Sequence, residues 1–134
     1  MQIALIIALS LHILSTVFWA GTSFTLARTG GAGGEQLFRP QMAAAVIAVL
    51  TGGYLGPLVH AGAFGTAEQI LAVGALAALV AAGVQGVIGG RAIRSLRTGT
   101  ADEAGVRSRI ATAQRVAAAL LAVTAVCMAA ARYV

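Results

Sequence analysis

Residues 2–28 read QIALIIALSLHILSTVFWAGTSFTLAR, and this stretch decides the class of the protein. No charged residue precedes Arg28, and the run is longer than the roughly 20 residues that a helix needs to cross a bilayer core of about 30 Å. It lacks a basic N-terminal region and is about twice as long as the apolar segment of a signal peptide. We therefore expect a retained transmembrane helix.

The rest of the chain repeats this pattern. Hydrophobic residues make up 59% of the 134 residues, charged residues only 10%, and the mean hydropathy is +0.90, which is typical of a membrane protein. Turn-forming or polar stretches separate the apolar segments. The sequence predicts an all-α integral membrane four-helix bundle in a single domain, 1–134, with helices over about 2–28, 40–60, 66–92 and 108–132.

The charges predict the orientation. All nine basic residues are arginine and the net charge is +5, but the arginines lie at the ends of apolar segments, which favours bilayer orientation over nucleic-acid binding. Seven of them fall on the side reached by the first and third loops. The positive-inside rule predicts that these loops are cytoplasmic and that both termini face out, in a multi-pass protein of the inner (cytoplasmic) membrane.

His12 is the most unusual residue of the first helix, because ionisable groups within a span are costly and usually paired or functional. Ser15, Thr16, Trp19 and Ser23 follow it at steps of three and four residues, so these side chains share one stripe. Lipid would leave their polar groups without partners, so the stripe is expected to face inward. Trp19 then packs either in the core or as a wall of a cofactor pocket.

His60 and Met128 are expected at similar depth. Counting 1.5 Å per residue from the arginines of each helix places His12 about 24 Å, His60 about 31 Å and Met128 about 28 Å away. Imidazole and thioether are axial ligands of haem iron, and with the thiolate of Cys127 they also suit copper. A histidine within the membrane can instead make one interhelical hydrogen bond.

Arg115 lies seven to eight residues into the fourth predicted helix. Its long side chain can extend to the cytoplasmic surface; alternatively it binds a propionate from within the bundle, beside Gln85. Arg28 could hold a propionate at the surface.

Small residues recur at four-residue spacing in two helices and predict close helix contacts. They could also leave a slot for a flat macrocycle. The pairs are Gly52 with Gly56 and Gly86 with Gly90, and Gly74, Ala78 and Ala82 extend a similar stripe.

The pattern His12, Trp19-Ala-Gly and Arg28 resembles the first helix of the HemJ-type membrane protoporphyrinogen oxidases and, more loosely, the CopD-like proteins. FRPQMAAAVIAVLTGGYLG and VQGVIGGRAIRSL look like that family's second and third helices. The resemblance implies that His12 ligates haem b. It also implies an oxidoreductase with a porphyrin or quinone partner.

The third helix departs from the family pattern. Glu68, Gln69 and Gln85 stand where the family has histidines and a lysine, which argues against protoporphyrinogen oxidase activity and leaves the second axial ligand open between His60 and Met128. The leading hypothesis is a membrane b-type haem protein with an electron-transfer role. The alternatives are a CopD-like copper-handling protein and a cofactor-free accessory subunit of a larger membrane complex or homo-oligomer.

Overall fold

The computed structural model describes residues 1–59, 62, 64–99 and 102–134. Its helices are α1 (Gln2–Arg28), α2 (Gly34–Val59), α3 (Thr66–Val84), the π-helix η1 (Gln85–Gly89), α4 (Gly90–Thr98) and α5 (Glu103–Ala131). The segments Gln2–Arg28, Gly34–Val59, Thr66–Thr98 and Glu103–Ala131 are each long and apolar enough to cross a membrane. The protein is an all-α four-helix membrane bundle, as predicted.

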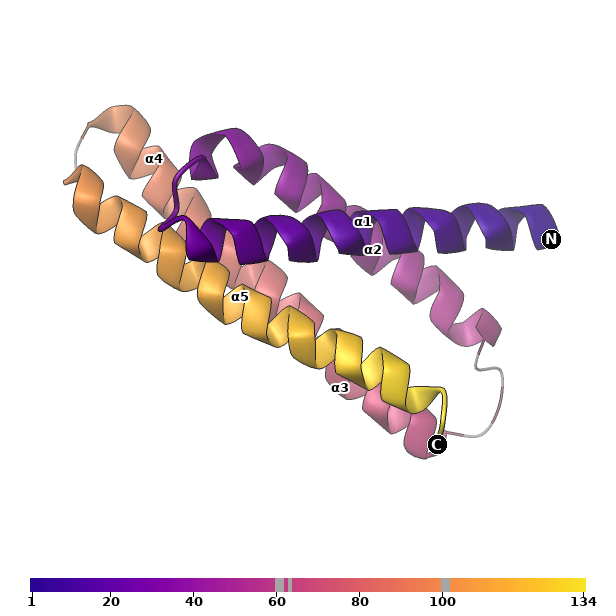
Figure 1. Cartoon of the computed structure of the whole chain (residues 1–134). Coiled ribbons are helices and arrows are strands. Elements are labelled where there is room, and N and C mark those ends of the chain that lie inside the picture. Colours follow the sequence, from indigo (N-terminus) through magenta and orange to yellow (C-terminus); the bar gives the residue numbers. More distant parts are fainter. Residues whose placement is uncertain (60–61, 63, 100–101) are drawn as a thin grey trace.

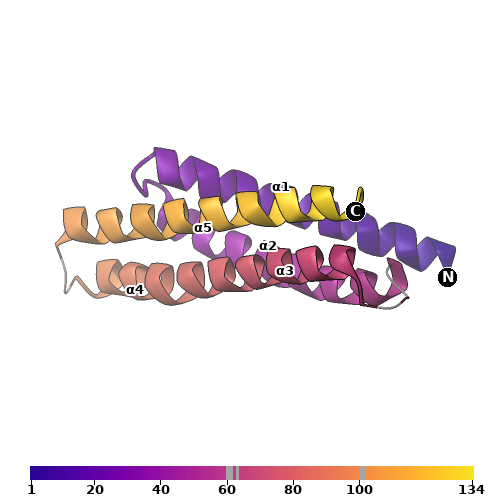
Figure 2. The same ribbon diagram turned by 90° about the horizontal axis from the view of Figure 1, so that it is seen from below.

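The helices pack as two pairs that are joined along one side. Figures 1 and 2 show α3, η1 and α4 as one continuous rod beside α5, while α2 returns along α1. α1 also packs against α5, whereas α2 and α3 touch only lightly. Both termini lie at one end, here called the termini end. The α1–α2 and α4–α5 connections lie at the other, the arginine end.

Two helices begin earlier than expected. α2 starts at Gly34 rather than near residue 40, so Pro40 lies inside the helix and not in its first turn. α5 starts at Glu103 rather than near residue 108, with Asp102 as its extended N-cap residue. In both cases an acidic residue occupies the first helical turn, where it interacts favourably with the helix dipole.

The third span is longer than predicted and is not uniformly α-helical. It runs from Thr66 to Thr98 instead of ending near residue 92, and Gly99 terminates it in the left-handed conformation (φ 64°) that suits glycine. Within it, Gln85–Gly89 form one π-helical turn. Such turns add a residue to the helix and often occur at functional sites.

The turn between α1 and α2 depends on Gly31. Its φ of +84° lies in the left-handed region, and a Cβ there would lie 2.8 Å from the carbonyl oxygen of Arg107. Arg107 in turn donates a hydrogen bond to the Gly31 carbonyl (3.2 Å) and forms an ion pair with Glu35. This turn is therefore held against the first turns of α5.

Three buried glutamines join the helices in the half of the bundle nearer the arginine end. Gln41 of α2, Gln85 of η1 and Gln114 of α5 are 0%, 0% and 3% exposed. Gln41 and Gln114 exchange amide hydrogen bonds of 3.1 and 3.0 Å, and Gln85 Nε2 donates to Gln114 Oε1 (2.9 Å). The amide groups supply the hydrogen bonds that this apolar interior would otherwise lack.

Serine and tryptophan side chains of α1 complete this glutamine network. Gln85 Nε2 also donates to Ser23 Oγ (2.7 Å), and Trp19 Nε1 donates to Gln85 Oε1 (2.6 Å). All four spans therefore meet in one connected set of polar side chains. Alanines surround the set, and Ala81 and Ala117 are fully buried.

Some of the small residues form the close helix contacts that were predicted, and others do not. A Cβ on Gly74 would lie 2.9 Å from Cys127 Cβ, so α3 and α5 approach closely there, and Gly90 packs against the Phe38 ring. Gly56, by contrast, has no neighbour within 4 Å of such a Cβ. It lines a cavity at the termini end instead.

Candidate functional site

A cavity of about 800 Å³ separates the two helix pairs in the half of the bundle nearer the termini end. Its walls are α1 from His12 to Ala20, α2 from Ala48 to Pro57, α3 from Glu68 to Leu79 and α5 from Leu121 to Met128, with Phe64 at the α2–α3 connection. Alanine and glycine supply much of this lining. Because α2 and α3 touch only lightly, the space between the pairs is not filled by side chains.

His12 is held in the cavity wall through one ring nitrogen. Its Nδ1 lies 3.0 Å from the Ala48 carbonyl oxygen and 3.0 Å from Thr51 Oγ1. A carbonyl can only accept, so Nδ1 carries the proton. The Thr51 hydroxyl already donates to the Ile47 carbonyl (2.6 Å) and therefore accepts from the same N–H.

This tautomer leaves a lone pair on Nε2. Among the described residues nothing hydrogen-bonds to Nε2, and the ring lines the cavity. A histidine that ligates a metal is usually fixed in this way, with its other ring nitrogen donating to a carbonyl. In the neutral imidazole, Nε2 of His12 therefore offers an acceptor to a largely apolar space.

Gly52 sets the position of the imidazole. A Cβ there would lie 3.1 Å from His12 Cε1, whereas one on the adjacent Gly53 would meet nothing within 4 Å. The ring thus packs closely against the α2 backbone at Gly52, with Cε1 nearest. A larger residue at position 52 would require the ring to shift.

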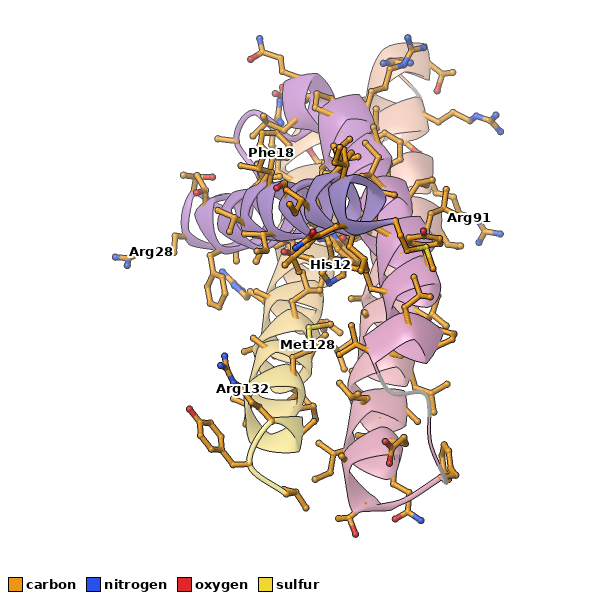
Figure 3. The ribbon with its side chains drawn as sticks, turned by 90° about the vertical axis from the view of Figure 1, so that its right-hand side faces the viewer. His12, Phe18, Arg28, Arg91, Met128 and Arg132 are labelled. Carbon is orange, nitrogen blue, oxygen red and sulfur yellow. The ribbon has the colours of Figure 1, made fainter. Side chains whose placement is uncertain are left out.

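Met128 lies in the wall that α5 contributes. It lines the same cavity as His12 and is 40% exposed. Figure 3 shows both residues beside the central opening between α5 and the α2–α3 side of the bundle. Cys127 does not line the cavity; its Cβ packs towards Gly74 of α3.

Trp19 forms the end of the cavity that is nearer the glutamine network. Its indole lines the cavity, is only 2% exposed, and donates its N–H to Gln85. Trp19 is therefore a core residue that also lines the cavity, and its role as the wall of a cofactor pocket stays a prediction. The same side chain connects the cavity to the glutamine network.

Glu68 is the acidic residue of the lining. It occupies the first turn of α3, where its carboxylate accepts the N–H of Gly65 (2.8 Å). Thr16 and Thr124 are further polar residues of the wall, but their hydroxyls donate to backbone carbonyls. His12 and Glu68 thus provide the ionisable groups of the described lining.

The remaining predicted site residues lie elsewhere. Arg28 and Arg115 are exposed and are not part of the cavity wall. Figure 3 shows Arg28 pointing away from the bundle. His60 lies outside the described residues. Within the described part of the chain no three His, Cys, Asp or Glu side chains gather as a metal site.

The sequence did not identify the partners of His12. Ala48 and Thr51 carry no motif, and only the rotation of α2 about its axis brings them to the ring. Gln85 was expected beside Arg115 and an anion; it instead bonds to Trp19, Ser23 and Gln114. Three glutamines in apolar segments are the signal that could have predicted this network.

Comparison with known proteins adds no assignment. No family model, no curated protein and no solved structure matches the chain.

Proposed function

We propose that this protein is a membrane b-type haem protein that takes part in electron transfer, with His12 as an axial ligand. The observation that carries the proposal is the His12 ring: Nδ1 donates to the Ala48 carbonyl (3.0 Å), and Nε2 is left with a lone pair at the cavity. This is the arrangement in which imidazole binds iron.

The cavity fits such a group in size and chemistry. Its volume of about 800 Å³ lies within the range of roughly 300–1,000 Å³ that small-molecule and cofactor sites occupy. Small residues on α2 and α3, among them Gly53, Gly56, Ala72 and Ala75, leave room for a broad apolar ligand. Arg28 and Arg115 lie away from the cavity, so the proposal gives them no role with the propionates.

Met128 is the second axial ligand that the described residues offer. Its thioether belongs to the wall of the same cavity, and ligation by histidine and methionine raises the reduction potential of haem iron. His60, which follows α2 in the sequence, is the alternative. With a second protein ligand from either residue, a bound haem would be suited to electron transfer rather than oxygen activation.

The residues of this chain have distinct roles in the proposal. When bound, the haem supplies reversible one-electron chemistry. His12 holds it, Ala48 and Thr51 fix the imidazole tautomer and ring orientation, and the alanines and glycines exclude water. The N–H of Trp19 donates to Gln85 and is therefore not available to a group bound in the cavity.

The membrane orientation follows from the arginines in this proposal. The positive-inside rule places the arginine end in the cytoplasm and the cavity in the outer half of the inner membrane. A quinone, a porphyrin or a partner subunit would exchange electrons there. The protoporphyrinogen oxidase reaction itself is not proposed, because the third helix lacks the family's lysine and histidines.

Absorption spectra of the detergent-purified protein, oxidised and dithionite-reduced, test the proposal. We expect a Soret band and a b-type α-band on reduction in the wild type, and loss of both in His12→Ala. Met128→Leu and His60→Ala separate the two candidates for the second ligand, since only the variant that removes a ligand shifts the reduced spectrum and the midpoint potential.

A second readout does not depend on redox chemistry. Trp19 is the only tryptophan of the chain and lines the cavity, so haem added to the apoprotein should quench its emission, and His12→Ala should weaken the quenching. Absence of a Soret band in protein from haem-supplemented cells, together with no quenching, would overturn the proposal. Copper in the same sample would then support the copper-handling alternative, and no metal the accessory subunit.

A further inference from the structure

The last turns of the third span carry a basic face that the fold itself does not use. Arg91, Arg94 and Arg97 follow one another at three-residue steps along α4, and all three are exposed. Residues three apart lie on the same side of a helix. Figure 3 shows Arg91 extending away from the bundle, on the side opposite Arg28.

The opposite face of α4 fixes this orientation. Ala92 and Ile93 are buried against Val106 and Ile110 of α5, and the Phe38 ring packs beside them. α4 therefore cannot rotate to hide its arginines without giving up this apolar cluster. The basic face is a permanent feature of the surface.

The described acidic residues nearby do not form ion pairs with these arginines. Arg107 binds Glu35 and lies 3.7 Å from Glu103. Asp102 is the N-cap residue of α5. In the described part of the chain no carboxylate lies within ion-pair distance of the three α4 arginines, so the face keeps its full positive charge.

The length of the span indicates where the basic face meets the membrane. Thr66–Thr98 comprises 33 residues, about 50 Å of helix, against a hydrocarbon core of about 30 Å. Because charged side chains are costly in the hydrocarbon core, we expect the excess at the arginine end, with Arg91, Arg94 and Arg97 near the lipid headgroups. Anionic headgroups attract arginines that lie near the membrane surface.

We propose that the α4 face formed by Arg91, Arg94 and Arg97 binds the phosphate headgroup of an anionic phospholipid. Guanidinium groups match phosphate oxygens with paired N–H donors. Val87 and Ile88, exposed in the turn before Arg91, provide apolar surface for the adjoining acyl chains. The site is independent of any cofactor in the cavity.

Native mass spectrometry of the detergent-solubilised full chain, titrated with phosphatidylglycerol or phosphatidylcholine, tests this proposal. The variant R91Q/R94Q/R97Q removes the face. The matched control R109Q/R115Q/R132Q removes three other exposed arginines and has the same net charge. Size exclusion and circular dichroism establish that both variants are folded.

We expect the wild type and the control to bind phosphatidylglycerol at least tenfold more tightly than phosphatidylcholine, and the α4 variant to lose that preference. Inorganic phosphate at millimolar concentration should not displace the lipid, because the acyl chains contribute to binding. Equal losses in both triple variants would show that only overall charge matters and would overturn the proposal. So would a wild type without preference for the anionic lipid, or full displacement by free phosphate.

Discussion

The two halves of the bundle are both rich in alanine and glycine, but these small residues have different effects in each half. Towards the arginine end, Ala81, Ala117 and the glutamine network fill the space between all four spans. Towards the termini end, alanines and glycines of α2 and α3 face each other across a cavity of about 800 Å³. Small residues therefore permit close packing only where another helix comes near; where α2 and α3 diverge, they leave room for a ligand.

The difference also concerns polar groups. In the glutamine network the amide groups bond to one another, to Ser23 and to Trp19, and this fixes the helices in one register. At the cavity, His12 has one ring nitrogen hydrogen-bonded, and the other has no hydrogen-bond partner among the described residues. One half is closely packed and the other holds the cavity of the proposed site, and four substitutions test this division.

The largest effect is expected from Gln85→Leu. It removes the acceptor of the buried Trp19 N–H and the donor to Ser23 and Gln114, so the free energy of unfolding should fall by about 2–3 kcal/mol. Reversible unfolding in mixed detergent micelles, followed by circular dichroism, measures the change. Gln69→Leu is the matched control, because Gln69 is exposed in the first turns of α3; equal effects would mean that the network does not stabilise the fold.

Gly74→Ala should have the next largest effect. Its Cβ would lie 2.9 Å from Cys127 Cβ and 3.4 Å from the Thr124 carbonyl oxygen, so α3 and α5 have to separate, at a cost of about 1–2 kcal/mol. Thermal unfolding in detergent measures it. Gly83→Ala on the same helix is the control, because its methyl group meets nothing within 4 Å and should leave the melting temperature unchanged or raise it. If the Gly74→Ala protein melts at as high a temperature as the Gly83→Ala protein, the close contact between α3 and α5 is contradicted.

Gly52→Ala tests the position of His12 in the cavity without substituting His12 itself. The new methyl group, 3.1 Å from Cε1, should displace the imidazole and weaken haem binding about tenfold, which corresponds to about 1.4 kcal/mol. Haem titration monitored through Trp19 emission gives the affinity. Gly53→Ala adds the same methyl group into open space, and loss of affinity in both variants would show that cavity volume, not the position of His12, limits binding.

Arg107→Gln should have the smallest effect. It breaks the ion pair with Glu35 and the bond to the Gly31 carbonyl, but both ion-pair side chains are about 30% exposed, so solvent screens the interaction. We expect a loss of about 0.5 kcal/mol, measured by unfolding at low and high salt. Arg109→Gln is the control, because Arg109 is an exposed arginine of the same helix. If Arg107→Gln lowers the free energy of unfolding by more than Gly74→Ala does, the arginine end contributes more to stability than its packing indicates.

The number of spans was predictable because hydropathy and length determine it. The first helix was predicted with its observed bounds, since an apolar run ends there at Arg28 and a glycine-rich turn. The predicted start of α2 was wrong because Pro40 was taken as a first-turn residue. The acidic residue Glu35 already marks the start of the helix.

The site was predictable only in part. Depth predicted one layer with His12, His60, Cys127 and Met128, and the stripe predicted Trp19 on the face of His12. His12, Trp19 and Met128 line the cavity, Cys127 does not, and His60 lies outside the described residues. Their partners were not predictable, because Thr51 and Gln85 depend on how each helix is rotated about its axis. Depth can be counted along a sequence, but rotation is determined by packing between helices.

The π-helical turn at Gln85–Gly89 lies between α3, which lines the cavity, and α4, which carries the exposed arginines. Each residue of an α-helix turns the chain by about 100°, so one residue more or fewer in this turn rotates everything after it by that angle relative to everything before it. The wall that α3 gives the cavity and the arginine face of α4 belong to the same rod. Their relative phase is set at this one turn, and a deletion there would turn the exposed α4 arginines relative to the cavity without altering a single residue of the cavity wall.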